Sequence, residues 1–96
     1  MARYQILYWK TIPALVEAFE GDRTVRIPLS QRFQELIDTV AVREGASAAE
    51  TYLEGWGKGP IAERPGSAEE VAQAVAAELE AAFQEILKEN LPAGDA

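Results

Sequence analysis

A chain of 96 residues, of which 48% are apolar and 26% charged, has the composition of one small globular domain. It contains no cysteine and no histidine, which excludes disulfides, thiolate nucleophiles, zinc sites built on those residues and the commonest general base near neutral pH. The net charge is −7, and the whole excess lies in residues 49–96 without any basic stripe. Neither nucleic acid nor an anionic membrane is therefore an expected partner.

The chain is expected to form a single domain over residues 1–90, followed by a flexible C-terminal tail over residues 91–96. Its apolar runs are too short to cross a bilayer, and its first residues lack the pattern of a signal peptide. A cytoplasmic location is the expectation. The composition is poor in thermolabile residues and its acidic segments are rich in Glu, which is typical of proteins from thermophiles.

The first half of the chain is predicted to be mainly β. Residues 3–9 are rich in aromatic and β-branched side chains, which predicts a strand with apolar groups on both faces. Residues 12–20 allow two interpretations. They fit a helical stripe that ends at Gly21, or a strand that pairs with residues 24–29 through a two-residue turn at Gly21-Asp22.

The hairpin is favoured because a single register satisfies several requirements together. It places Glu17 opposite Arg26 and Glu20 opposite Arg23, which gives two complementary charge pairs. The same register gathers four apolar side chains on one face: Val16, Ala18, Val25 and Ile27.

The second half is predicted to be mainly helical. Apolar side chains recur at helical spacing after Ser30, whose hydroxyl is expected to cap the helix: Phe33, Leu36, Ile37, Val40 and Ala41. Ser47 and Ser67 each begin a capping box, the first before a short helix and the second before one long helix that runs to about Asn90. Between these helices, residues 55–59 predict a glycine-rich solvent loop and residues 60–64 a short edge strand.

These elements predict an α+β fold in two layers. A mainly antiparallel sheet of three or four strands is expected to pack against two main helices and one short helix.

No pattern of catalytic or binding residues emerges from the sequence. Residues 55–59 lack the spacing of a phosphate-binding loop, since Pro60 follows where a helix should begin. The serines fit helix caps and have no histidine to activate them. The paired carboxylates recur on helix faces expected to be solvated. We therefore predict no catalytic residue, no cofactor and no metal site, and expect that the protein is not an enzyme.

The aromatic residues suggest an interaction surface instead. Helices can cover only one face of such a small sheet, so Trp9, Phe19 and Arg26 are candidates for a surface on the open face. The alternative is that some of the aromatic side chains pack beneath the short helix and the glycine-rich loop.

Three stretches of the chain carry a family resemblance. They are Tyr4-Gln5-Ile6-Leu7-Tyr8-Trp9-Lys10 with Ile12-Pro13-Ala14, then Leu29-Ser30 with Arg32-Phe33-Gln34 and Ile37-Asp38, and finally Tyr52-Leu53-Glu54 with Trp56. Together they resemble the bacterial "virulence factor" domain family, which occurs as short stand-alone proteins and as the C-terminal domain of conserved virulence factor C. The resemblance covers residues 4–64 and carries over no catalytic residue and no cofactor. It adds Arg32, Tyr52 and Trp56 to the candidate interaction surface.

Two classes of function are expected from this combination. The first is a non-enzymatic protein-interaction or assembly module, either a homo-oligomer or a binder of another protein. The alternative is a small-molecule or metal-ion binding domain, or an enzyme that uses carboxylates together with Arg32.

Overall fold

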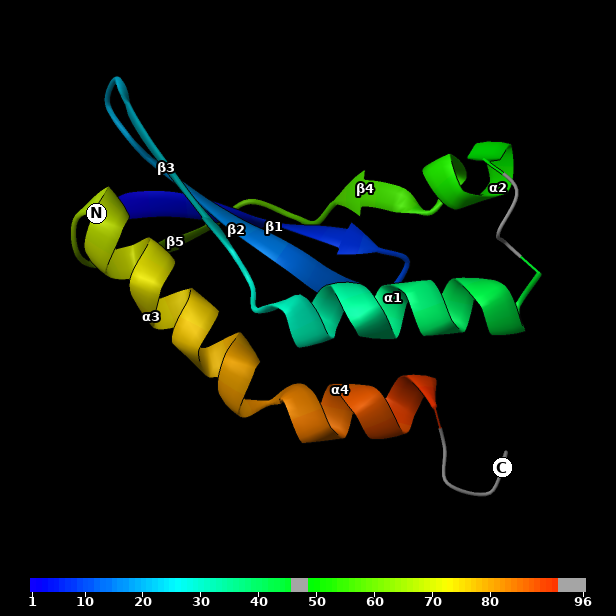
Figure 1. Ribbon diagram of the computed structural model, residues 1–96. Coiled ribbons are helices and arrows are strands. Elements are labelled where there is room, and N and C mark those ends of the chain that lie inside the picture. Colours follow the sequence, from blue (N-terminus) through cyan, green and yellow to red (C-terminus); the bar gives the residue numbers. More distant parts are fainter. Residues whose placement is uncertain (46–48, 92–96) are drawn as a thin grey trace.

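The computed structural model describes residues 1–45 and 49–91 of the chain. Within these residues the fold is an antiparallel sheet with helices packed on one of its faces (Figure 1), so the predicted α+β architecture is confirmed. Its strands are β1 (Ala2–Trp9), β2 (Ile12–Glu20), β3 (Arg23–Pro28), β4 (Trp56–Lys58) and β5 (Ala62–Arg64). Its helices are α1 (Gln31–Arg43), α2 (Ala49–Glu54), α3 (Ala68–Ala81) and α4 (Phe83–Asn90). The predicted cap at Ser47 and most of the predicted tail, residues 92–96, lie outside the described residues.

The strand order is β3-β2-β1-β4, and β5 pairs with the beginning of β1 on the same side as β4. The prediction that residues 55–59 form a solvent loop is wrong, because Trp56–Lys58 pairs with the end of β1 as β4. The sheet therefore has one more strand than the sequence indicated. Flexible glycines do not prevent a strand where a neighbouring strand supplies the hydrogen bonds.

The β2–β3 hairpin has the predicted register, so the helical alternative for residues 12–20 is wrong. Glu17 lies opposite Arg26, and Glu20 lies opposite Arg23. Gly21 has a φ of 58°, a left-handed conformation that this residue type adopts without strain and that a two-residue hairpin turn requires.

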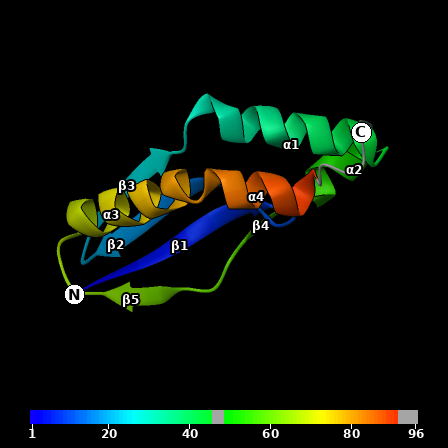
Figure 2. The ribbon, with the colours of Figure 1, turned by 90° about the horizontal axis from the view of Figure 1, so that it is seen from below.

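The core lies between the sheet and the helices α1, α3 and α4. These helices lie on one side of the sheet: viewed from below, α3 and α4 pass in front of the strands, and α1 lies beside them past the end of β3 (Figure 2). Val16 and Ala18 of β2 are fully buried beneath them, and Phe33 and Ile37 are the largest buried side chains that α1 contributes. The alternation of side chains along a strand then directs the residues between these positions to the opposite face, which α1, α3 and α4 leave uncovered.

The long helix predicted after Ser67 is interrupted. Its capping box is confirmed, because the Ser67 hydroxyl accepts a hydrogen bond from the Glu70 N–H at 3.1 Å and the Glu70 carboxylate accepts one from the Ser67 N–H at 3.0 Å. The helix ends at Ala81, however, and α4 begins at Phe83 in a different direction (Figure 1).

Arg32 supplies the physical reason for this break. Its guanidinium Nη2 donates a hydrogen bond to the backbone carbonyl of Glu80 at 2.8 Å. A carbonyl in the last turn of α3 is therefore bound by a side chain from α1. The change of direction brings Phe83 edge-to-face against Phe33, with ring centroids 4.9 Å apart.

A cluster of aromatic side chains packs at the end of β1, around Trp9. Trp9 is 0% exposed, stacks on Tyr52 at 5.8 Å between ring centroids, and donates its indole N–H to the Tyr52 carbonyl at 2.7 Å. Trp56 packs edge-to-face on Tyr52 at 6.0 Å. Gly55 lies against the indole so closely that a methyl group there would sit 2.4 Å from Trp9 Nε1.

We expect Gly55→Ala to lower the free energy of unfolding by about 1–3 kcal/mol, because the added methyl group overpacks a fully buried indole that is already hydrogen-bonded. Urea denaturation followed by circular dichroism measures the effect. Gly57→Ala is the matched control in the adjacent strand, where a new Cβ meets no atom within 4 Å. Equal losses of stability in the two variants would contradict this account of the cluster.

Candidate functional site

The uncovered face of the sheet is the candidate site. The register assigns its side chains from every strand: Arg3, Gln5 and Leu7 of β1, Leu15, Glu17 and Phe19 of β2, Thr24, Arg26 and Pro28 of β3, Lys58 of β4 and Glu63 of β5. Leu7, Leu15 and Phe19 are half-buried there, although α1, α3 and α4 all pack on the other side. Apolar side chains that stay accessible on a sheet face are typical of a contact surface.

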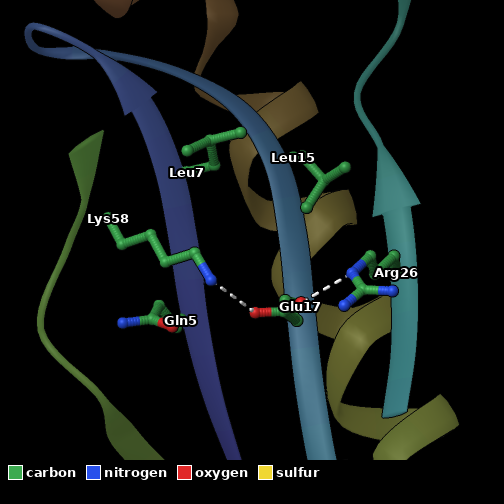
Figure 3. Close-up of a pocket in the computed structure, with 6 residues that line it drawn as sticks. All are labelled: Gln5, Leu7, Leu15, Glu17, Arg26 and Lys58. Atoms are coloured by element: carbon green, nitrogen blue, oxygen red, sulfur yellow. Dashed lines mark hydrogen bonds and ion pairs between the residues drawn. The ribbon is translucent and has the colours of Figure 1, made fainter. Parts of the chain in front are cut away.

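A buried carboxylate lies at the centre of this face. Glu17 is 6% exposed, and its Oε2 accepts a hydrogen bond from Arg26 Nε at 2.6 Å (Figure 3). Its Oε1 lies 3.6 Å from Lys58 Nζ, which reaches toward it from the far side of β1. Both carboxylate oxygens therefore face a cation, as a buried charge requires.

The surroundings of Glu17 form a shallow hollow of about 180 Å³. Leu7 and Leu15 form its apolar border, while Gln5 lies beside the ion pairs and donates its side-chain amide to the Gly59 carbonyl at 3.0 Å (Figure 3). The hollow thus combines an apolar border with the exposed side chains of Arg26 and Lys58. Such a surface can bury apolar groups of a partner and donate hydrogen bonds to an acceptor beside them.

The charge of this face differs from the charge of the rest of the chain. Three cations and two carboxylates lie on it: Arg3, Arg26 and Lys58 with Glu17 and Glu63. The face therefore carries a formal charge of +1, whereas the chain as a whole carries −7, which leaves −8 for all other residues. The face thus differs in the sign of its charge from the remainder of the chain.

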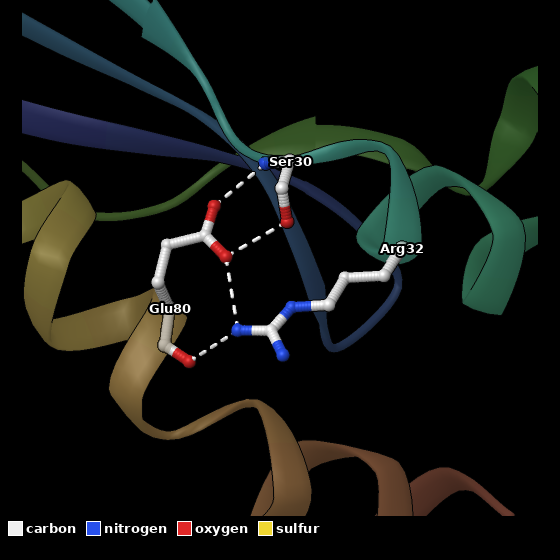
Figure 4. Close-up of polar contacts among 3 residues, drawn as sticks. All are labelled: Ser30, Arg32 and Glu80. Carbon is white, nitrogen blue, oxygen red and sulfur yellow. Dashed lines mark hydrogen bonds and ion pairs between the residues drawn. The ribbon is translucent and has the colours of Figure 1, made fainter.

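A second polar cluster joins α1 to α3. The Glu80 carboxylate accepts hydrogen bonds from the Ser30 N–H at 2.6 Å and from the Ser30 hydroxyl at 2.8 Å, and its Oε1 lies 3.1 Å from Arg32 Nη2 (Figure 4). The prediction that the Ser30 hydroxyl caps α1 is wrong, because this hydroxyl donates to Glu80 instead. Glu80 comes from a helix 50 residues later, so no local pattern could indicate it.

These contacts change the acidity of Glu80. Its partial burial raises the pKa, but the Ser30 N–H, the Ser30 hydroxyl and the Arg32 guanidinium outweigh that effect and hold the pKa of Glu80 below its ordinary value. The cluster stabilises the joint between the helices.

The sequence profile of the virulence factor family matches residues 7–91. The chain belongs to the virulence factor family. The resemblance read from residues 4–64 is thus confirmed, and the match continues through α3 and α4. No curated protein and no solved structure matches the chain.

Most of the motif residues that carry the family resemblance serve the fold. Trp9, Ile12 and Phe33 are buried, and Pro13 lies opposite Tyr8 at an irregularity between β1 and β2. Arg32 takes part in the joint with α3, where its guanidinium also lies 4.3 Å from the centroid of the Phe83 ring. In this chain these residues take part in packing and in the joint with α3.

The six residues predicted as an interaction surface do not form one surface. Phe19 and Arg26 lie on the uncovered face, as proposed from the hairpin register. Arg32 faces α3 and α4, while Tyr52 and Trp56 pack around Trp9 at the end of β1. The alternative, in which aromatic side chains pack beneath the short helix, describes the cluster at Trp9 correctly.

Sequence reasoning missed several residues of the candidate site. It paired Glu17 with Arg26 correctly, but Lys58 was assigned to a solvent loop. Lys58 reaches Glu17 only because β4 pairs with β1, and the sequence carries no strand signal around its flanking glycines. The alternation of side chains along the first strand predicts that Gln5 and Leu7 share one face. This pattern could have assigned both residues to the candidate site.

Metal binding and membrane insertion find no support in the described part of the chain. No group of three or more acidic side chains in residues 1–45 and 49–91 could hold a metal ion. No helix in those ranges is long and apolar enough to cross a membrane.

The Glu80 cluster makes stability depend on pH. Because the pKa of Glu80 is lower in the folded chain, its contribution is fully present above the ordinary carboxylate pKa and is lost as the pH falls through the folded value. We expect Glu80→Gln to cost about 1 kcal/mol at pH 7, after allowance for solvent screening, and the gap to the unmodified chain to close as the pH falls below the ordinary carboxylate pKa and through the lower folded value. Urea titrations at a series of pH values measure both quantities.

Glu85→Gln is the matched control for this experiment. It removes one exposed carboxylate on α4 that makes no ion pair with any described residue, and so reproduces the change in net charge. A gap between Glu80→Gln and the unmodified chain that stays constant with pH would refute the assignment to Glu80.

Proposed function

We propose that this member of the virulence factor family is a non-enzymatic protein-interaction module that binds a partner on the uncovered face of its sheet. The observation that carries the proposal is Glu17, a buried carboxylate that is held between Arg26 and Lys58 on a face with accessible leucines. It costs free energy to bury a charged side chain such as Glu17. The face nevertheless retains this carboxylate and leaves the hollow around it open, where apolar side chains could have filled the space.

The chemistry of the face defines the kind of partner. Leu7, Leu15 and Phe19 offer apolar area, which gains about 25 cal/mol for each Å² that a partner removes from water. Arg26 uses its Nε on Glu17, so the remaining N–H groups of its half-exposed guanidinium can donate to a carboxylate of the partner. The partner is therefore a protein segment that combines apolar and acidic side chains.

The same geometry supports a binding role over an enzymatic one. Both oxygens of Glu17 face cations, so this carboxylate is not positioned as a free base. The hollow of about 180 Å³ is smaller than the pockets of roughly 300–1,000 Å³ that hold small-molecule substrates. Two further hollows, one beside Tyr8 and one beside Arg32 and Glu35, have about 180 and 200 Å³ and are equally small.

A displayed library of random peptides provides the test. We expect selection on the folded chain to enrich peptides that combine acidic with large apolar residues. Leu15→Lys should weaken an enriched peptide by about tenfold, because it puts a charge into the apolar border of the hollow. Lys58→Gln should weaken the same peptide several-fold and reduce the salt dependence of its binding.

Lys88→Gln is the control, because it makes the same change of charge on α4, on the other side of the sheet. Circular dichroism establishes that each variant is folded. Failure to enrich any peptide, or binding that is lost with Lys88→Gln but kept with Leu15→Lys, would overturn the proposal.

A further inference from the structure

The two edges of the sheet differ in structure. At one side β4 and β5 are three residues long each, and they pair with separate parts of β1. Short and offset strands of this kind are poor templates for a further strand. At the other side β3 is six residues long and has β2 as its only described neighbour.

The hairpin register shows which backbone groups of β3 point outward. In a two-residue hairpin the pair next to the turn, Glu20 and Arg23, exchanges both of its hydrogen bonds. The alternation then directs the N–H and C=O groups of Val25 and Ile27 toward β2 and those of Thr24 and Arg26 away from it. No described strand pairs with these outward groups.

The charges on β3 would normally protect such an edge. Arg23 and Arg26 are both basic, and like charges oppose the pairing of two identical strands. Each of them, however, is compensated within its own chain, since Arg23 forms an ion pair with Glu69 of α3 and Arg26 with Glu17 of β2. The charge at the edge is therefore partly offset, and no described strand pairs with its outward backbone groups.

We propose that a second copy of this chain occupies the edge, and that the two β3 strands pair in antiparallel fashion about a two-fold axis at Val25. Thr24 then lies opposite Arg26 of the partner subunit, and each such pair exchanges both of its hydrogen bonds. Val25 lies opposite the partner's Val25 on the helix-covered side. This pairing is independent of the face proposed above for partner binding, but it would join the uncovered faces of the two copies into one.

The neighbouring registers fit less well. A shift in one direction places Arg26 opposite the partner's Arg26, which brings like charges together, and places Thr24 opposite Pro28 of the partner subunit, which has no N–H to donate. A shift in the other direction uses Asp22, which lies in the hairpin turn and outside β3. The axis at Val25 is the register that uses strand residues alone and opposes no like charges.

Disulfide trapping tests this register, because the chain has no cysteine of its own. In the proposed dimer the two Val25 residues form a non-hydrogen-bonded pair with Cα atoms about 4.5 Å apart, within the range of about 4.4–6.8 Å that a disulfide spans. We expect Val25→Cys to give a covalent dimer on mild oxidation. Thr24→Cys should cross-link far less, since it faces Arg26 of the partner subunit and is diagonal to its own equivalent.

Val42→Cys is the control for random collisions, because Val42 is exposed on α1. Covalent dimer that forms equally with Val42→Cys and Val25→Cys would overturn the proposal. Stronger cross-linking through Thr24→Cys than through Val25→Cys would overturn the axis at Val25.

Light scattering over a range of concentrations tests the association itself. We expect the unmodified chain to dimerise and Thr24→Pro to be monomeric, because proline removes an outward N–H without removing a bond to β2. Thr24→Arg is a second variant that keeps the backbone donor and opposes Arg26 of the partner subunit with a like charge. It should also be monomeric, while circular dichroism shows the fold intact.

An unmodified chain that stays monomeric at its highest soluble concentration, or a dimer that persists in both Thr24 variants, would overturn the inference. Peptide binding separates this outcome from the proposed function. Leu15 lies on β2, away from the free edge of β3, so a Leu15→Lys variant that loses the selected peptides and still dimerises separates the two proposals.

Discussion

The register of the β2–β3 hairpin is the constraint on which the rest of the structure depends. Because side chains alternate along a strand, a slip of one residue would move Val16 and Ala18 out of the core and turn Glu17 toward the helices. The turn at Gly21 and the ion pair between Glu17 and Arg26 favour the same register independently. The core on one face and the polar hollow on the other follow from that one arrangement.

The uncovered face and the free edge of β3 have a common origin in this hairpin. Glu17 compensates Arg26, and in doing so it removes a charge that would otherwise protect the edge. The same ion pair forms the centre of the hollow, where Lys58 arrives from the opposite side of β1. A single buried carboxylate thus influences both surfaces that we propose as contact sites.

The helical layer changes direction once, between α3 and α4. Arg32 binds the Glu80 carbonyl and carboxylate, which ends α3 and lets α4 lie along α1. Trp9 performs the corresponding task at the other end, where its buried indole holds α2 against the end of β1. Residues that carry the family resemblance take part in both contacts. In this chain these residues pack the fold, although aromatic and arginine residues in a sequence also suggest an interface.

The sequence by itself determined the α+β class, the first strand, the helix after Ser30 and the cap at Ser67, and it favoured the hairpin register over a helix for residues 12–20. These features depend on periodicity, turn residues and pairs that lie close together in the chain, so local patterns are sufficient to predict them. Only the tertiary structure decided that Trp56–Lys58 is a strand, that the last helix breaks at Ala82, that Ser30 binds Glu80, and that Lys58 joins Glu17 and Arg26. Each of these depends on a partner many residues away, and the free energy of such a contact appears only when the two segments have been brought together in space.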